Sequence, residues 1–133
     1  MGDSFYEYMI KMHVYTDKTV PQYRRMYDKS MAGVMEKLIY DSTPTGLTYI
    51  AEMQGGNIVP KMDHLACFVP GMLALGAAGA GPNKDKHMRV ARGIGRTCYE
   101  MYKRQASGVA PEFINFVNNN DFVNGNSKHS PAH

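Results

Sequence analysis

Two carboxylates, Asp3 and Glu7, stand four residues apart near the start of the chain, in the segment GDSFYEY. On a helix this spacing places both side chains on one face, with about 5 to 6 Å between their Cβ atoms. Carboxyl groups held close together supply the acid and base that cleavage of an acetal needs. The rings of Phe5, Tyr6 and Tyr8 offer flat apolar surfaces that sugars pack against. The segment therefore predicts a site for carbohydrate chemistry.

The same segment also has a purely structural interpretation. Ser4 followed by Glu7 has the form of a capping box, in which two side chains satisfy backbone groups at a helix N-terminus. We expect a helix from Ser4 to about Tyr15. The residues alone leave a capping role and a functional role for Glu7 equally open.

Three more helices are expected along the chain. Apolar residues three and four positions apart, with Pro21 near the start, predict a helix over 20–39. A third helix should open at Asp63 or His64 and end in the glycine-rich stretch 76–81, and a fourth should cover 84–105. Between the second and third, dense Pro and Gly signals indicate a long loop, in which 47–53 predicts a short β-ribbon strand.

Length and charge limit the classes of function. The 133 residues suit one domain, and the net charge of +3 is dispersed, which gives no indication of a nucleic-acid partner. Arg89, Arg92 and Arg96 recur at three and four residues, which suits a phosphate-binding stripe or, in the favoured interpretation, a solvated outer face. The chain contains no targeting signal and no run of about 18 apolar residues, so no membrane segment is expected.

Three further segments, KMDHLACFVPG, TCYEMY and SGVAPE, follow GDSFYEY along the chain. Each is a weak signal alone, since a single histidine such as His64 near a helix start is usually structural. Together and in this order they closely resemble the class I α-mannosidases, glycoside hydrolase family 47. Members of that family trim α-1,2-linked mannose from N-linked high-mannose oligosaccharides. The resemblance covers residues 2–133.

The resemblance implies roles for particular residues. Asp3 and Glu112 match acidic active-site residues and are the expected catalytic positions. Glu7, four positions after Asp3, matches a second acidic residue of the first motif, and His64 and Leu65 match residues that line the sugar pocket. These three are the expected substrate-binding positions.

The same resemblance implies a disulfide between the two cysteines. Cys67 and Cys98 match the pair that forms a disulfide in this family, whereas the residues alone leave two free core thiols equally open. A bridge implies an oxidising compartment, here the lumen of the endoplasmic reticulum or Golgi.

The resemblance also implies an incomplete site. The family's upstream glutamate, its RPExxES segment and the Thr-Glu pair that holds calcium have no counterpart in these residues. Calcium is therefore expected in a parent enzyme and not bound tightly by this chain alone. His13 stands where the family often has Trp, which suggests divergence.

The fold implied is an all-α segment of an (α/α)7 barrel, with about four helices and a short β-ribbon in a long loop. Residues 1–133 form part of the catalytic domain, with 116–133 expected as a polar C-terminal extension without a core of its own. The helices starting near Ser4 and His64 are expected to be inner ones, and those at Val20 and Lys84 outer ones. The remainder of the barrel is then an expected partner.

Two functions from different classes follow. The first is part of an inverting α-1,2-mannosidase acting on high-mannose N-glycans, inactive as this chain alone. The alternative is a non-catalytic, mannosidase-like protein that binds glycans or glycoproteins during quality control. A weaker alternative is a small helical adaptor unrelated to sugars.

Overall fold

The structure is a computed structural model that describes residues 3–122, the side chain of Asp3 excepted. Four α-helices contribute most of the regular structure, and they are α1 (Asp3–Tyr15), α2 (Pro21–Lys37), α3 (Val69–Ala77) and α4 (Lys84–Lys103). The strands are β1 (Ile39–Asp41), β2 (Thr48–Ile50), β3 (Glu52–Gln54), β4 (Asn57–Val59), β5 (Lys61–Asp63) and β6 (Phe113–Asn115). Short 3-10 turns are η1 (His64–Phe68), η2 (Gly81–Asn83) and η3 (Val117–Asn119).

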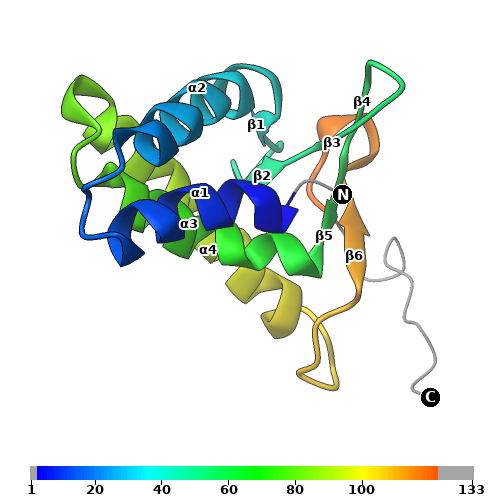
Figure 1. Ribbon diagram of the computed structural model, residues 1–133. Helices are drawn as coiled ribbons and strands as arrows, with labels where there is room; N and C mark the ends of the chain where they lie inside the picture. Colours follow the sequence, from blue (N-terminus) through cyan, green and yellow to red (C-terminus); the bar gives the residue numbers. More distant parts are fainter. Residues whose placement is uncertain (1–2, 123–133) are drawn as a thin grey trace.

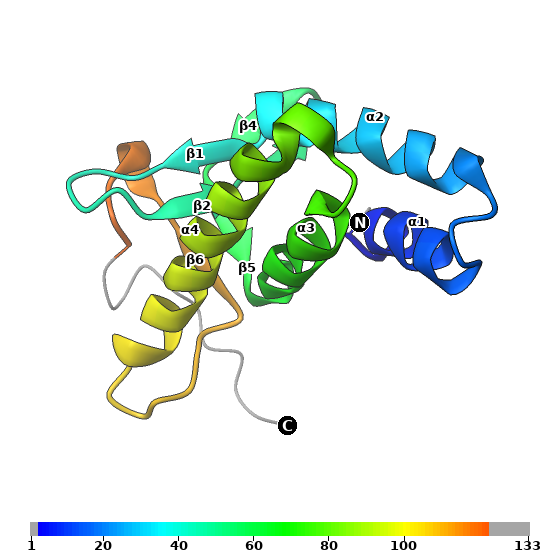
Figure 2. The same cartoon turned by 90° about the vertical axis from the view of Figure 1, so that its left-hand side faces the viewer.

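The helices pack as two pairs, with the strands gathered at one end of the molecule (Figures 1 and 2). Helix α1 packs on α2, α3 packs on α4, and α1 also contacts α3. No helix in the described part of the chain combines the length and apolarity needed to cross a membrane. The mainly helical character agrees with the all-α expectation, and the barrel itself stays a prediction.

Burial along α2 and α4 follows the helical period. On α2, Tyr27, Met31 and Val34 face the core, and Pro21 occupies the first turn, where a missing N–H costs nothing. On α4 the buried residues again recur every three or four positions, and they are His87, Val90, Ala91, Ile94, Thr97, Cys98 and Met101. Arg89, Arg92 and Arg96 lie exposed on the other side, as the solvated-face interpretation predicts.

The third helix begins later than the sequence predicts. Residues His64–Phe68 form the 3-10 turn η1, and α3 starts at Val69. Pro70 explains the difference, because its nitrogen has no hydrogen to donate to the carbonyl four residues back. A continuous α-helix from His64 would lose that bond, whereas Pro70 is well accommodated in the first turn of a new helix.

The strands form three antiparallel pairs. The strand expected over 47–53 is split between β2, which pairs with β1, and β3, which pairs with β4. Gly55 and Gly56 turn the β3–β4 hairpin with φ values of 56° and 86°, a region that glycine enters at little cost. The pairing of β5 with β6 was not expected, and its central pair, Met62 and Ile114, is fully buried.

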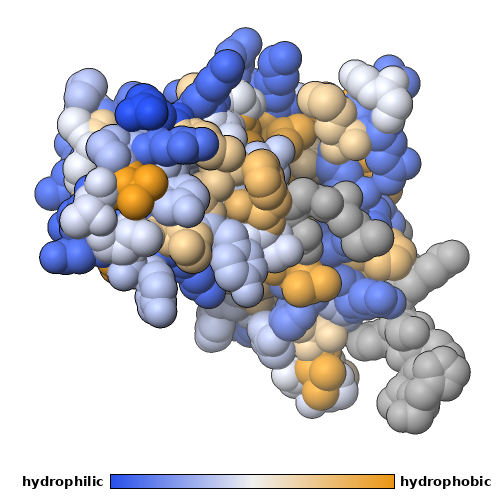
Figure 3. Space-filling view, in the orientation of Figure 1, coloured by the Kyte–Doolittle hydropathy of each residue, from blue (hydrophilic) through white to orange (hydrophobic). Residues whose placement is uncertain are grey.

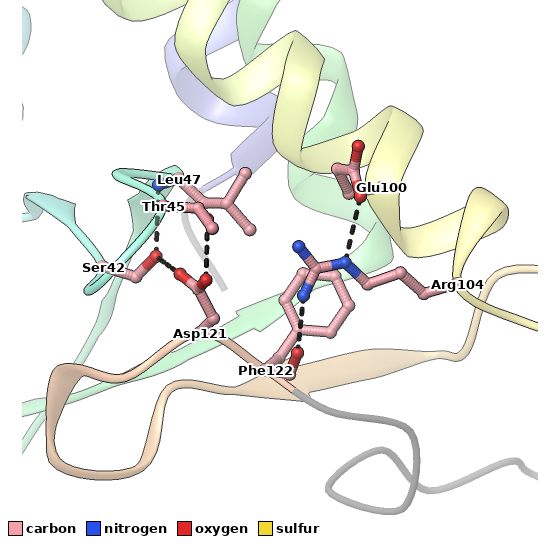
Figure 4. Close-up of polar contacts among 7 residues, drawn as sticks. All are labelled: Ser42, Thr45, Leu47, Glu100, Arg104, Asp121 and Phe122. Atoms are coloured by element: carbon pink, nitrogen blue, oxygen red, sulfur yellow. Dashed lines mark hydrogen bonds and ion pairs between the residues drawn. The ribbon is translucent and has the colours of Figure 1, made fainter.

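Residues 116–122 are part of the packed structure, which corrects the expectation of a tail without a core. Phe116 and Phe122 are 0% and 1% exposed, and Phe116 stacks on Tyr49 with ring centroids 3.8 Å apart. The carboxylate of Asp121 accepts hydrogen bonds from the Ser42 and Thr45 hydroxyls (Figure 4). The polar composition of the segment predicted no buried residues, but its two phenylalanines are part of the core. Residues 123–133 of the expected extension lie outside the described residues.

Arg104 holds the same segment from the helical side. Its guanidinium donates to the backbone oxygen of Phe122 at 2.9 Å and lies over the Phe122 ring, 4.7 Å from the centroid. Glu100, one turn earlier on α4, accepts from Arg104 at 3.0 Å and fixes its direction (Figure 4). The segment is therefore attached both to α4 and to the β1–β2 hairpin.

Candidate active site

Strand pairing brings two of the expected site residues together. Asp63 on β5 lies opposite Phe113 on β6, and the N–H of His64 donates to the backbone oxygen of Glu112 at 2.7 Å. The pairing thus continues by one hydrogen bond beyond the strands, and it places His64 beside Glu112 although they are far apart in the sequence. The Glu112 side chain is exposed.

Helix α4 fixes the η1 turn from the other side. Cys67 and Cys98 form a disulfide, as the family resemblance predicts, with 5.9 Å between their Cα atoms. The hydroxyl of Tyr102 lies 2.5 Å from Nε2 of His64, and the two rings meet edge to face at 5.4 Å. Cys98 and Tyr102 are four residues apart, so one face of α4 makes both contacts. The η1 turn is consequently restrained near both of its ends.

The N-terminal end of α1 carries the other expected acidic residues. Glu7 is half-buried and forms an ion pair with Lys11 at 2.6 Å, one turn further along the helix. Ser4 lies inside α1, which begins at Asp3, so Ser4 is not the N-cap that the capping-box interpretation requires. The carboxylate of Asp3 lies outside the described atoms, and its catalytic role stays a prediction.

A cleft of about 570 Å³ opens between α1, α2, α3, the β2–β3 segment, β5 and η1. Tyr6, the neighbour of Glu7 in the sequence, lines this cleft together with Leu65, the neighbour of His64. The cleft is thus lined by sequence neighbours of Glu7 and His64, whereas Glu7, His64 and Glu112 are not among its lining residues. Its interior is mainly apolar, with lining side chains that include Met31, Val34, Leu38, Ile50, Ala51, Phe68, Val69 and Met72.

A charged cluster that the motif comparison did not single out borders the same cleft. Lys61 forms ion pairs with Glu52 at 2.8 Å and with Asp63 at 2.6 Å, and it lies over the Phe113 ring. Burial lowers the pKa of Lys61, but its hydrogen bonds to Asp63 and Glu52 outweigh burial and hold that pKa above its usual value. Burial raises the pKa of Glu52, and bonds from Lys61 and Gln54 reverse that shift. The alternation of Lys61 and Asp63 in KMD is the sequence signal for this cluster.

Exposed apolar side chains surround the candidate regions. Leu65 is 71% exposed, and Phe5 and Tyr8 on α1 are also largely exposed. Figure 3 shows apolar side chains gathered between hydrophilic ones on the face that carries α1. Side chains of this kind suit contact with sugar rings, and the sugar-lining role of Leu65 stays a prediction.

The described residues do not form a metal site by themselves. Within residues 3–122 no group of three or more His, Cys, Asp or Glu side chains converges to hold an ion. Calcium takes six to eight oxygen ligands at about 2.3–2.6 Å, and Glu7 and Glu112 do not provide such a cage. The expectation that calcium is bound only in the complete enzyme stays a prediction.

Comparisons with known proteins agree with the order of the motifs. The profile of glycosyl hydrolase family 47 matches residues 1–132. A mannosyl-oligosaccharide 1,2-alpha-mannosidase of Arabidopsis thaliana is 46% identical over 130 residues, which cover 96% of this chain and 23% of that protein. Mannosyl-oligosaccharide 1,2-alpha-mannosidase IB of Homo sapiens is 44% identical, covering 87% of this chain and 18% of the human protein.

The solved structures give the same result. The alpha-1,2-mannosidase from Trichoderma reesei matches with a TM-score of 0.75 and 28% identity, covering 89% of this chain and 25% of that one. The chain spans about a quarter or less of the length of each of these proteins. From the profile match and the identities, the chain belongs to glycosyl hydrolase family 47.

Proposed function

We propose that this chain is a segment of an inverting α-1,2-mannosidase catalytic domain that removes mannose from high-mannose N-glycans. The observation that carries the proposal is the hydrogen bond between the His64 N–H and the Glu112 oxygen, which puts two motif residues side by side. Family membership and relatives named as 1,2-alpha-mannosidases favour the enzyme over a glycan-binding protein without activity.

The chemistry needs two carboxyl groups with different tasks. In an inverting glycosidase, one protonates the leaving oxygen and the other activates water on the opposite face, about 6.5 to 9.5 Å away. Asp3 and Glu112 are proposed as the catalytic carboxyl residues contributed by this segment. His64 and Glu7 hydrogen-bond sugar hydroxyls, and Leu65 provides apolar contact. Because this is only part of a site, the chain alone has little or no turnover.

The remaining parts of the proposal concern the surroundings of the segment. The (α/α)7 barrel places α1 and α3 on the inside and α2 and α4 on the outside, and the remainder of the barrel covers the exposed face of α1. Calcium is bound by the complete enzyme, using residues outside this chain. The disulfide between Cys67 and Cys98 supports work in an oxidising lumen, that of the endoplasmic reticulum or Golgi.

A chimeric enzyme tests the proposal. Residues 1–122 replace the matching segment of the Arabidopsis relative, and release of mannose from a high-mannose glycan is measured. We expect the chimera to hydrolyse the glycan. Asp3→Asn and Glu112→Gln should each lower kcat/KM by at least about 100-fold, the usual contribution of an acid or base.

Glu36→Gln serves as the matched control, because Glu36 is exposed on α2 and has no proposed role. This variant should keep the activity of the chimera. Folding of each variant is followed by its thermal unfolding. A Glu112→Gln variant that folds and keeps near-original turnover would refute the proposed role of Glu112.

A further inference from the structure

We infer that Tyr102 is a positioning residue for His64, and that its hydroxyl donates to Nε2 and thereby keeps the imidazole proton on Nδ1. This inference rests on the proposed function, because it concerns the sugar-binding role of His64. It assigns a task to a tyrosine that the motif comparison left without one.

The first step is the contact itself. The Tyr102 oxygen lies 2.5 Å from Nε2 of His64, and the rings are 5.4 Å apart at an interplanar angle of 70°. Neutral imidazole has one donor nitrogen and one acceptor nitrogen, and the partner of one nitrogen decides the state of the other. A phenol is the stronger donor of the two groups. Tyr102 therefore donates, and Nδ1 carries the hydrogen that is offered to a sugar hydroxyl.

The second step is the rigidity of the pair. The backbone N–H of His64 donates a hydrogen bond to the backbone oxygen of Glu112 at 2.7 Å. Cys67, three residues later, forms the disulfide with Cys98. Because Cys98 and Tyr102 share one face of α4, the disulfide links the helix face that carries Tyr102 to the turn that carries His64. Tyr99 on the same helix is 60% exposed, and its ring lies 5.7 Å from the ammonium group of Lys103.

Nitrogen NMR of the histidine side chains in this chain tests the tautomer directly. At about pH 9, where histidine side chains are neutral, the shifts of Nδ1 and Nε2 report which nitrogen carries the proton. The His64 signals are identified by their loss in His64→Gln. We expect the Nδ1–H form in the unmodified chain and a shift towards the Nε2–H form in Tyr102→Phe. Tyr99→Phe, which also loses one hydroxyl, should leave the His64 signals unchanged.

The kinetic consequence is measured in the chimera. Tyr102→Phe should lower kcat/KM about three- to tenfold, as expected for one neutral hydrogen bond, while Tyr99→Phe keeps it. An Nε2–H tautomer in the unmodified chain, or unchanged His64 signals in Tyr102→Phe, would overturn the inference. Unchanged kcat/KM in Tyr102→Phe would do so as well.

The two proposals fail separately. If Glu112→Gln remains active while the His64 tautomer depends on Tyr102, the proposed function fails and the positioning contact stands. If Glu112→Gln is inactive while the tautomer is independent of Tyr102, the positioning inference fails and the function stands.

Discussion

The two regions that carry the candidate site are held in different ways. The His64 region is held by a disulfide and the Tyr102 contact, both from α4, and by strand pairing to β6, so two elements fix it. The N-terminal end of α1 is held by packing on α2 and α3, and the ion pair of Glu7 stays within its own helix. One half of the site is therefore preorganised within the chain, and the other half relies on the position of a single helix.

Removal of the disulfide is the strongest test of the difference. The double variant Cys67→Ala/Cys98→Ala should lose about 3 to 4 kcal/mol of unfolding free energy, because the bridge closes a long loop in the unfolded chain. Denaturant unfolding under oxidising conditions measures the loss. The unmodified protein in reductant should show a similar loss. A change below about 1 kcal/mol would mean that strand pairing and the Tyr102 contact hold the His64 region without the bridge.

The contact between α3 and α2 is tested by a methyl group at Gly76 on α3. A Cβ atom there would lie 2.1 Å from the Tyr27 hydroxyl oxygen, and Tyr27 is fully buried. We expect Gly76→Ala to cost about 2 to 3 kcal/mol of unfolding free energy, because the fully buried Tyr27 ring must shift to admit the methyl group. Thermal and denaturant unfolding measure this cost.

Gly33→Ala on α2 is the matched control for that substitution. No atom lies within 4 Å of the Cβ position at Gly33, so the methyl group meets open space. This variant should gain about 0.5 to 1 kcal/mol because alanine favours the helix. Equal effects of the two substitutions would contradict the close packing of α3 on α2.

The attachment of residues 116–122 should depend on pH. Burial raises the pKa of Asp121, but hydrogen bonds from Ser42 and Thr45 outweigh it, so the pKa in the folded chain lies below the usual value. The stabilisation is then complete above about pH 4 and is lost as the pH falls through the lower folded-state pKa. Asp121→Asn should cost about 1 to 2 kcal/mol at neutral pH, and the difference from the unmodified protein should shrink in acid. If the difference in unfolding free energy between Asp121→Asn and the unmodified protein grows in acid, the Asp121 carboxylate does not stabilise this segment.

The smallest change in stability is expected at the N-terminal end of α1. Glu7→Gln removes an ion pair to the exposed Lys11, and pairs of this spacing contribute about 0.3 to 0.5 kcal/mol. Unfolding of this chain should therefore change little. A loss above about 1 kcal/mol would show that Glu7 holds the fold and would weaken its assignment to substrate binding.

The sequence predicts some of these features and not others for physical reasons. The second helix follows from apolar periodicity and the first from local signals near Ser4, and the bridge between Cys67 and Cys98 follows from family motifs. The β5–β6 pairing was missed, because three residues give no readable alternation and the partner strand lies far along the chain. The contact of Tyr102 with His64 was missed for a similar reason, although its spacing from Cys98 was a usable signal.

Composition misled the prediction in one place. Asparagines dominate the stretch after Phe113, and they conceal Phe116 and Phe122, which complete the core around Tyr49. Single aromatic residues in a polar segment form no periodic apolar pattern, so their burial is seen only in the folded structure. The expected start of the third helix at Asp63 or His64 failed because Pro70 was not weighed as a break.

The central claim is that the two differently held regions act in one active site, and a double-mutant cycle in the chimera tests it. Glu7→Gln, Glu112→Gln and the double variant are compared by kcat/KM for mannose release. Residues that act on one transition state are strongly non-additive, so we expect a coupling of at least about 1 kcal/mol. Effects that add within about 0.3 to 0.5 kcal/mol would show that Glu7 and Glu112 act independently and would contradict a shared site.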